Sequence, residues 1–159
     1  MSTARVHHPQ LHGRLLRAGS RLLGALLRRG ARLGPMMLLT VPGRKTGMPR
    51  STPVDVFEHD GRKWVVSTHG VGDSNWVRNL RATRQGVLSR GAQTFAFTAA
   101  EVPSEDVADT LRRVIGPRLA RPVAGFVLRR TLRLSTSASA DAFARAAETH
   151  PVFELRSRS

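Results

Sequence analysis

Several residue types are absent or scarce in this chain of 159 residues. It contains no cysteine, which excludes a disulfide framework and a thiolate metal site, and we expect no bound metal. Aromatic residues make up only 5% of the chain and tyrosine is absent. Proteins that bind single-stranded nucleic acid stack bases on aromatic rings, so this composition disfavours that class. Arginine interrupts the apolar residues near the N-terminus every few positions, so we expect neither a cleavable signal peptide nor a membrane-spanning helix there.

Acidic residues are also scarce. The chain has 11 Asp and Glu against 26 Lys and Arg, which gives a formal net charge of +15 at pH 7. Such an excess indicates an anionic partner, which could be a nucleic acid, an acidic membrane surface or a polyanionic small molecule. The shortage of aromatic residues makes nucleic acid the least favoured of the three. The length suits one domain with a short appendage and allows a substantial core.

Residues 11–33 have the periodicity of an amphipathic helix. Leucines fall on one side, at Leu15, Leu16, Leu22, Leu23, Leu26, Leu27 and Leu33. Arginines fall on the other side, at Arg14, Arg17, Arg21, Arg28 and Arg32. Two interpretations stay open, because the leucine side can pack on the rest of the protein or enter the surface of an anionic membrane. We therefore divide the chain into a basic amphipathic segment at 1–34 and a folded domain at 35–159.

The stretch from Met36 to Pro53 carries the strongest functional signal. A short apolar run, suited to a buried strand, is broken at Pro42-Gly43, and a second extended run follows. The loop between the runs joins basic and hydroxyl side chains with two glycines: Gly43, Arg44, Lys45, Thr46, Gly47 and Arg50. We expect the glycines to turn backbone N–H groups inward while the cations supply charge, so that the loop binds an anion. A hairpin whose charges only face water is the alternative.

Turn signals predict the remaining elements. Asp60-Gly61 predicts a hairpin, so residues 38–68 form a three-stranded antiparallel meander. A helix at 75–83 follows. Further along we expect a hairpin at 86–100, a helix at 105–115, a partly helical stretch at 118–134, a short helix at 141–148 and a last strand at 151–155. The spacing of the apolar residues favours a barrel or a sandwich over a parallel sheet.

Four stretches in combination resemble one known family. They are LLTVPGRKTGMPRSTPV, DGRKWVVSTHG, NWVRNLRA and the C-terminal HPVFEL. Together they resemble the deazaflavin-dependent nitroreductase family, over residues 36–102 and more loosely at the C-terminal end. The resemblance implies an α+β fold, mainly an antiparallel split β-barrel of the FMN-binding type with flanking helices. It also implies an oxidoreductase that transfers a hydride from reduced deazaflavin coenzyme F420 to a small quinone, nitro or enone-like acceptor.

The resemblance further implies a set of site residues. The basic loop would hold the phosphate and the acidic glutamyl tail of the coenzyme, and the strand end at Thr68 would lie along the deazaflavin ring. The implied cofactor-binding residues are Arg44, Lys45, Thr46, Gly47, Arg50, Pro53, Thr68, His69, Gly70, Trp76 and Asn79. Thr68 and His69 are the candidates for a catalytic role in supplying a proton, with bulk water as the alternative donor. Family members have tyrosines near the substrate, and this chain has none.

Three functions stay open. The first is an F420-dependent oxidoreductase, the second a module that binds F420 or FMN without turnover, and the third a basic protein associated with a membrane. FMN is the alternative cofactor because the same class of barrel uses it, whereas the longer anionic tail of F420 suits the basic loop better. We expect a cytoplasmic protein whose partners are a small-molecule acceptor and, through residues 11–33, the inner face of a membrane.

Overall fold

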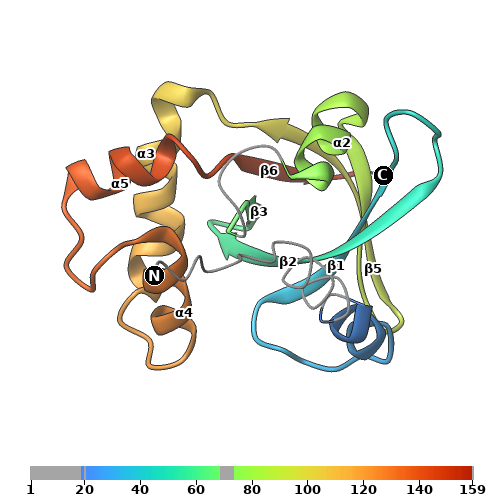
Figure 1. Ribbon diagram of the computed structural model, residues 1–159, viewed down its shortest axis with the longest axis horizontal. Coiled ribbons are helices and arrows are strands. Elements are labelled where there is room, and N and C mark those ends of the chain that lie inside the picture. Colours follow the sequence, from blue (N-terminus) through green and yellow to red (C-terminus); the bar gives the residue numbers. More distant parts are fainter. Residues whose placement is uncertain (1–18, 20, 69–73, 159) are drawn as a thin grey trace, which may run out of the picture.

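A closed barrel of six antiparallel strands forms the centre of the protein (Figure 1). The computed structural model describes residue 19, residues 21–68 and residues 74–158. Around the barrel the strands follow the order β1-β2-β3-β6-β5-β4. Their bounds are β1 (Met36–Pro42), β2 (Pro49–His59), β3 (Arg62–Val66), β4 (Gln85–Arg90), β5 (Gln93–Glu101) and β6 (Val152–Ser157). The predicted α+β fold with a mainly antiparallel barrel is confirmed.

Tight turns join the first three strands as the sequence predicts. At the β2–β3 turn, Asp60 and Gly61 have φ angles of 51° and 72°, the left-handed pair that a two-residue hairpin of type I′ requires. The register pairs Thr40 with Ser51 across β1 and β2, and Val56 with Val65 across β2 and β3. The three-stranded meander is therefore confirmed, and so is the β4–β5 hairpin that turns at residues 91–92.

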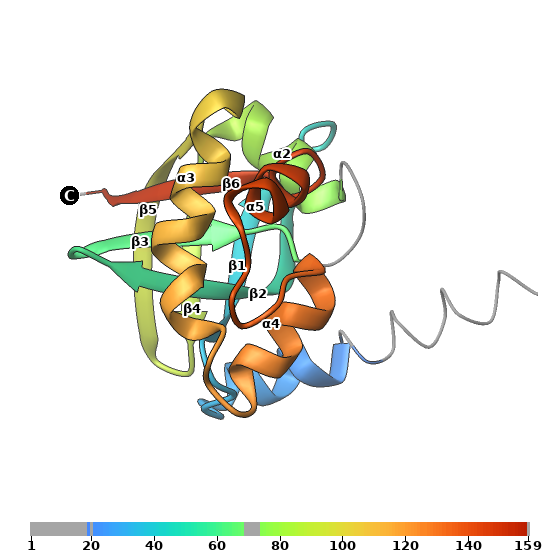
Figure 2. The same ribbon diagram turned by 90° about the vertical axis from the view of Figure 1, so that its left-hand side faces the viewer.

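The helices lie on two sides of the barrel. They are α2 (Asn75–Thr83), α3 (Ser104–Ile115), the 3₁₀ turn η1 (Gly116–Arg118), α4 (Ala124–Leu132) and α5 (Ala140–Ala147). Figures 1 and 2 show α3, α4 and α5 gathered on one side, whereas α2 lies near the β1–β2 loop. The bounds of α2 match the predicted helix at 75–83, and those of α3 and α5 differ from the predictions by one residue. Helix α4 lies within the stretch at 118–134 that was predicted to be partly helical.

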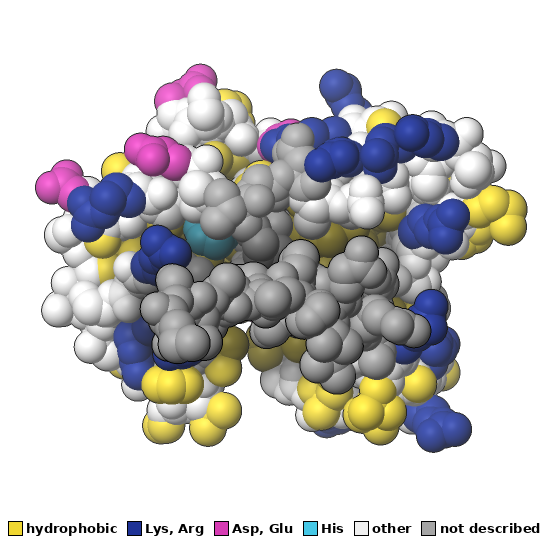
Figure 3. Space-filling model, in the orientation of Figure 1, with side chains coloured by type: hydrophobic (Ala, Val, Ile, Leu, Met, Phe, Trp, Pro, Cys, Tyr) yellow, Lys and Arg dark blue, Asp and Glu magenta, His cyan; other side chains and the backbone are white. Residues whose placement is uncertain are grey.

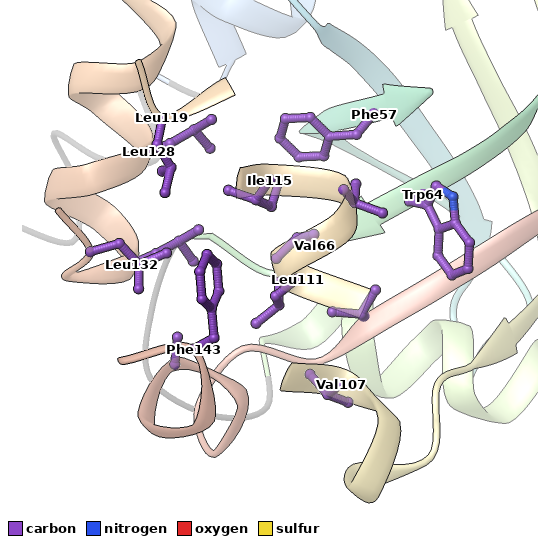
Figure 4. Packing of buried hydrophobic residues seen from close by; sticks show 14 residues of the cluster. Phe57, Trp64, Val66, Val107, Leu111, Ile115, Leu119, Leu128, Leu132 and Phe143 are labelled. Atoms are coloured by element: carbon purple, nitrogen blue, oxygen red, sulfur yellow. The ribbon is translucent and has the colours of Figure 1, made fainter. Parts of the chain in front are cut away.

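Two apolar clusters hold these layers together. The first lies inside the barrel and includes Val65 and the buried face of α2. The second lies between the outside of the barrel and the α3–α5 layer, and Figure 4 shows Trp64 and Val66 of β3 with Ile115 of α3 in it. Neighbouring residues of β3 thus serve different clusters, because successive side chains of a strand point to opposite faces. Full burial of one such side chain contributes about 1.5–3 kcal/mol.

The N-terminal helix ends earlier than the sequence predicts. Among the described residues, 19 and 21–28 are helical, and the expectation that the helix reaches residue 33 is wrong. Gly30 ends the helix with a φ of 88°, and the N–H groups of Gly30 and Ala31 donate to the carbonyls of Leu27 and Leu26. Leu27 is fully buried, whereas Leu22 is 65% exposed, so the leucine side is only partly covered. Within the described residues, no helix is long and apolar enough to cross a membrane.

This helix is joined to the barrel at the β4–β5 turn. The backbone N–H of Gly91 donates to the carbonyl of Leu27 at 2.8 Å. A Cβ at Gly91 would lie 2.9 Å from the Cα of Gly30, and Gly91 itself has a φ of 60°, so this close approach of the two backbones requires glycine at position 91. The end of the helix is therefore held against the barrel.

Candidate functional site

A cleft of about 730 Å³ lies between the β1–β2 loop and α2. We call it the basic cleft, and its lining residues are Gly43, Arg44, Lys45, Thr46, Pro49, Arg50, Ser51, Thr52, Asn75, Trp76 and Asn79. They come from two segments, the hairpin around residues 43–52 and the first turns of α2. Six of the predicted cofactor-binding residues meet here: Arg44, Lys45, Thr46, Arg50, Trp76 and Asn79.

The β1–β2 loop has a defined backbone conformation. The N–H of Gly43 donates to the carbonyl of Met48 at 2.8 Å, and the N–H of Gly47 donates to the carbonyl of Gly43 at 2.7 Å. Closing the hairpin therefore uses the N–H groups of both glycines, and the prediction that other backbone N–H groups of the loop turn toward an anion stays a prediction. Gly47 instead contributes its left-handed φ of 69° to the turn. The cations of the loop, Arg44, Lys45 and Arg50, are exposed.

Asn79 joins the loop to α2. Its side-chain oxygen Oδ1 accepts hydrogen bonds from the backbone N–H of Arg44 at 3.2 Å and from Arg44 Nη1 at 3.0 Å. Asn79 is only 5% exposed, so a buried amide fixes both the backbone and the guanidinium of Arg44. Figure 3 shows Lys and Arg side chains gathered over α2 and the neighbouring hairpin on this face of the protein.

The first turn of α2 forms the opposite wall. Asn75 and Trp76 line the basic cleft, and the free N–H groups of a helix N-terminus add a partial positive charge there. Trp76 is largely buried, and its ring lies 6.0 Å from that of Phe153 on β6 at an interplanar angle of 57°. That geometry is typical of a tilted aromatic pair. Trp76 therefore anchors α2 in the barrel core and presents one edge to the cleft.

Charge of one sign dominates the basic cleft. Three cationic side chains line it, and no carboxylate does within the described residues. Ser51 and Thr52 add two hydroxyl groups that the sequence analysis did not assign to the site. The sequence did contain a signal for these hydroxyl groups, because Ser51 directly follows Arg50. In the structure Ser51 pairs with Thr40 across the two strands, and their hydroxyl oxygens lie 2.8 Å apart. This donor set suits an extended anion.

Three of the remaining predicted site residues, Gly47, Pro53 and Thr68, are described and do not line the basic cleft. Pro53 lies within β2 opposite Leu38, and Gly47 is at the tip of the loop. Thr68 is buried just after β3, where its hydroxyl lies 3.4 Å from Oδ2 of Asp55. His69 and Gly70 lie outside the described residues.

A second cavity, which the sequence analysis did not foresee, contains Thr68. We call it the α4–α5 pocket, and it has a volume of about 370 Å³. Its lining residues are Thr68, Thr131, Leu132, Arg133, Ala142, Arg145, Ala146, Thr149 and His150. Eight of the nine lie within residues 131–150, and only Thr68 is distant in the sequence, so the pocket forms where this region packs on the end of β3.

Comparison with known proteins gives a consistent family. The family described as F420H2-dependent quinone reductase matches residues 16–121. An F420H2-dependent quinone reductase of Mycobacterium tuberculosis is 30% identical over 105 residues, which make up 64% of each of the two chains. The chain therefore spans less than two thirds of the length of that relative. All residues of the basic cleft lie within the matched range, whereas most of the α4–α5 pocket lies beyond it.

Solved structures share the fold at low sequence identity. HutZ, described as a heme storage protein from Vibrio cholerae, has a TM-score of 0.54 at 14% identity, and the match covers 80% of this chain and 84% of HutZ. A protein from Bacteroides thetaiotaomicron, described as a candidate 5-nitroimidazole antibiotic resistance protein, has a TM-score of 0.53 at 8% identity. That second match covers 80% of this chain and 75% of the other. At these identities the two structures support the barrel fold alone.

Proposed function

The chain belongs to the F420H2-dependent quinone reductase family, and we propose that it transfers a hydride from reduced coenzyme F420 to a small organic acceptor of the quinone type. Reduction of a quinone to a quinol requires a hydride, which the bound coenzyme would supply, and one further proton, which His69 or bulk water would supply. The observation that carries the proposal is the basic cleft, with three cations and no carboxylate among its described lining residues.

The donors of the basic cleft fit the anionic tail of the coenzyme. Phosphate and glutamyl carboxylates are matched by the guanidinium groups of Arg44 and Arg50 and by the ammonium of Lys45. Arg44 is held in place by Asn79, so less side-chain freedom is lost when an anion binds. A Cβ at Gly43 would lie 3.2 Å from the carbonyl oxygen of Met48, so a side chain there would crowd the closed loop. The residues present thus fit the coenzyme better than the shorter FMN.

The remaining residues would position the reactive ring and exclude water. We propose that Trp76 and Asn79 bound the ring site on the α2 side, with Pro53, Thr68, His69 and Gly70 along its other side. When bound, the deazaflavin supplies the hydride, and the part of the protein is to orient it and to exclude water. Thr68 lies close to the Asp55 carboxylate and can orient or relay a proton, while His69 is our candidate donor.

The donor role has its own test. We expect His69→Ala to leave the affinity for F420 nearly unchanged while it lowers turnover and removes the acid-side limb of the pH profile. If turnover and its pH dependence match those of the parent protein, bulk water supplies the proton. A loss of affinity would instead make His69 a ring-binding residue.

One titration tests the proposed cofactor. F420 and FMN are added separately to the protein, and binding is followed by fluorescence quenching and by calorimetry. We expect F420 to bind more tightly, and an equal or higher affinity for FMN would contradict the choice of cofactor. Oxidation of reduced F420 is then followed with quinone, nitro and enone acceptors. Tight binding without turnover on this panel would favour the carrier module over the enzyme.

We also propose that the protein is cytoplasmic and docks on an anionic membrane surface. Leu22 and Leu26 of the N-terminal helix are exposed, and so are Val123 and Phe126 beside or within α4. Figure 3 shows hydrophobic side chains at the lower edge of the molecule, over α4 and over the first helix. An apolar edge flanked by arginines suits an interfacial site. The division of the chain at residue 34 stays a prediction.

Vesicle binding tests the docking. The protein is sedimented with phosphatidylglycerol vesicles at low and high salt, and phosphatidylcholine vesicles serve as the control. We expect salt-sensitive binding to the anionic vesicles that Leu22→Glu weakens. If the intact protein stays in the supernatant with both lipids, the membrane proposal is wrong.

A further inference from the structure

The α4–α5 pocket lies where the helical layer meets the ends of two barrel strands. Thr68 follows β3, His150 precedes β6, Arg133 ends α4 and Arg145 is on α5. The backbone N–H of Ser67 donates to the carbonyl of Pro151 at 3.0 Å, which fixes the two strand ends relative to each other. The pocket therefore has a rigid floor on the barrel side and helical walls.

His150 has an orientation that this floor determines. It is 7% exposed, and its Nδ1 lies 2.7 Å from the carbonyl oxygen of Ser67. A carbonyl oxygen only accepts hydrogen bonds, so Nδ1 must carry the hydrogen. In the neutral imidazole the other ring nitrogen, Nε2, is then a hydrogen-bond acceptor. Within the described residues Nε2 has no hydrogen-bond partner, and His150 lines the pocket.

The helical walls supply positive charge. Neither Arg133 nor Arg145 forms an ion pair with a described residue, and no described carboxylate lines the pocket. Thr131 and Thr149 add hydroxyl groups. The exposed guanidinium groups of Arg133 and Arg145 thus line the same cavity as His150. The α4–α5 pocket therefore suits a ligand that is anionic at one end and donates a hydrogen bond at the other.

We propose that the α4–α5 pocket binds a small acidic phenol or quinol. The guanidinium groups of Arg133 and Arg145 bind its carboxylate or phosphate, and Nε2 of His150 accepts a hydrogen bond from its hydroxyl. The volume of about 370 Å³ lies in the range of small-molecule sites. The proposal deepens the proposed function. Only the choice of a quinol rests on that function, because a quinone acceptor becomes a quinol when it is reduced.

Calorimetric titration of the whole protein without coenzyme tests the pocket directly. The probes are 3-hydroxybenzoate, which has both groups, benzoate, which lacks the hydroxyl, and phenol, which lacks the carboxylate. We expect 3-hydroxybenzoate to bind about tenfold more tightly than either single-group probe, since charged hydrogen bonds contribute about 1.5–3 kcal/mol. Equal affinity for the three probes, or no binding of any, would overturn the proposal.

Two substitutions assign the two contacts separately. Arg145→Ala should remove the preference for 3-hydroxybenzoate over phenol and leave the affinity for phenol unchanged. His150→Asn should remove the preference over benzoate, because asparagine can still donate to the Ser67 carbonyl but has no atom in place of Nε2. The asparagine variant therefore separates ligand binding from the hydrogen bond that holds the strand ends. A preference that survives both substitutions contradicts the assignment.

Two matched controls locate the ligand. Arg130→Ala removes an exposed arginine of α4 that does not line the pocket, and it should leave all three affinities unchanged. Lys45→Ala removes a cation from the basic cleft and should also leave them unchanged. If Lys45→Ala weakens 3-hydroxybenzoate binding and Arg145→Ala does not, the ligand binds in the basic cleft and the proposal is wrong. Because no coenzyme is present, failure here is distinguishable from failure to bind F420.

Discussion

The basic cleft and the α4–α5 pocket are built in different ways. The basic cleft takes all its lining residues from 43–52 and 75–79, and a hairpin with its neighbouring helix is enough to form it. The α4–α5 pocket combines the end of β3, the end of α4, the length of α5 and the start of β6. The first cavity lies between one hairpin and α2, whereas the second lies where the α4–α5 region packs on the end of β3.

The same contrast appears in what supports each cavity. Two backbone hydrogen bonds close the loop at Gly43 and Gly47, and Asn79 fixes Arg44. The walls of the α4–α5 pocket depend instead on the apolar cluster between the barrel and α3–α5, which includes Leu132 and Phe143 (Figure 4). A mutation in that cluster should therefore disturb the pocket while it spares the cleft.

The largest expected effect comes from opening the helical layer. Leu132 on α4 is 2% exposed, and Leu132→Ala should lower the free energy of unfolding by about 2–5 kcal/mol through lost burial and a residual cavity. Chemical denaturation measures this loss. The matched control is Val127→Ala on the same helix, where the side chain is 48% exposed and little burial is lost. In the folded Leu132 variant, F420 affinity should persist while 3-hydroxybenzoate affinity falls, and a loss of both would show that the cavities are not independent.

The next effect is confined to the basic cleft. Replacing Arg44, Lys45 and Arg50 together by alanine should weaken F420 binding at least about a hundredfold, because each charged contact contributes about 1.5–3 kcal/mol. Lys45→Ala alone should weaken it about tenfold. Fluorescence titration measures the affinity, and denaturation should show unchanged stability, since all three side chains are exposed. An unchanged dissociation constant for the triple variant would rule out the cleft as the cofactor site.

A smaller effect tests whether the cleft is preorganised. Asn79→Ala removes the acceptor of two hydrogen bonds from Arg44, so we expect F420 affinity to fall about three- to tenfold. Asn79→Asp keeps an oxygen acceptor in the same position and should retain the orientation of Arg44. Comparing the two dissociation constants separates positioning from simple loss of a side chain. Equal affinities for the alanine variant and the parent protein would mean that Arg44 needs no support.

The smallest effect lies on the surface of the helical layer. A hydrogen bond from Arg112 lowers the pKa of Asp109 from its usual 3.8. Since the folded pKa is below the unfolded one, the carboxylate stabilises the fold above the unfolded pKa, and this contribution is lost as the pH falls through the folded pKa. Asp109→Asn should therefore lower the denaturation midpoint slightly at neutral pH and not at all well below pH 3.8. The same difference at both pH values would exclude this ion pair as the cause.

The contrast between the cavities also explains what the sequence could predict. Turn residues such as Asp60-Gly61 and the alternation of β2 act over a few positions, so the meander and the basic loop follow from them. His150 gave no such signal, because its hydrogen-bond partner Ser67 is distant in the sequence. The order of strands around the barrel and the early end of the N-terminal helix also depend on tertiary contacts. Leu27 and Gly91 meet only in the folded protein.

The place of β6 in the barrel has a consequence for biosynthesis. β6 pairs with β3 on one side and with β5 on the other, so the barrel wall has a gap until residues 152–157 are in place. A ribosome releases these residues after all other strands have emerged, and contacts between distant segments form slowly. We therefore infer that on the nascent chain the edges of β3 and β5 that pair with β6 stay unpaired until β6 emerges. Unpaired strand edges are prone to aggregation. The barrel therefore closes only after residues 152–157 have been synthesised, because β6 supplies the pairing partner of both β3 and β5.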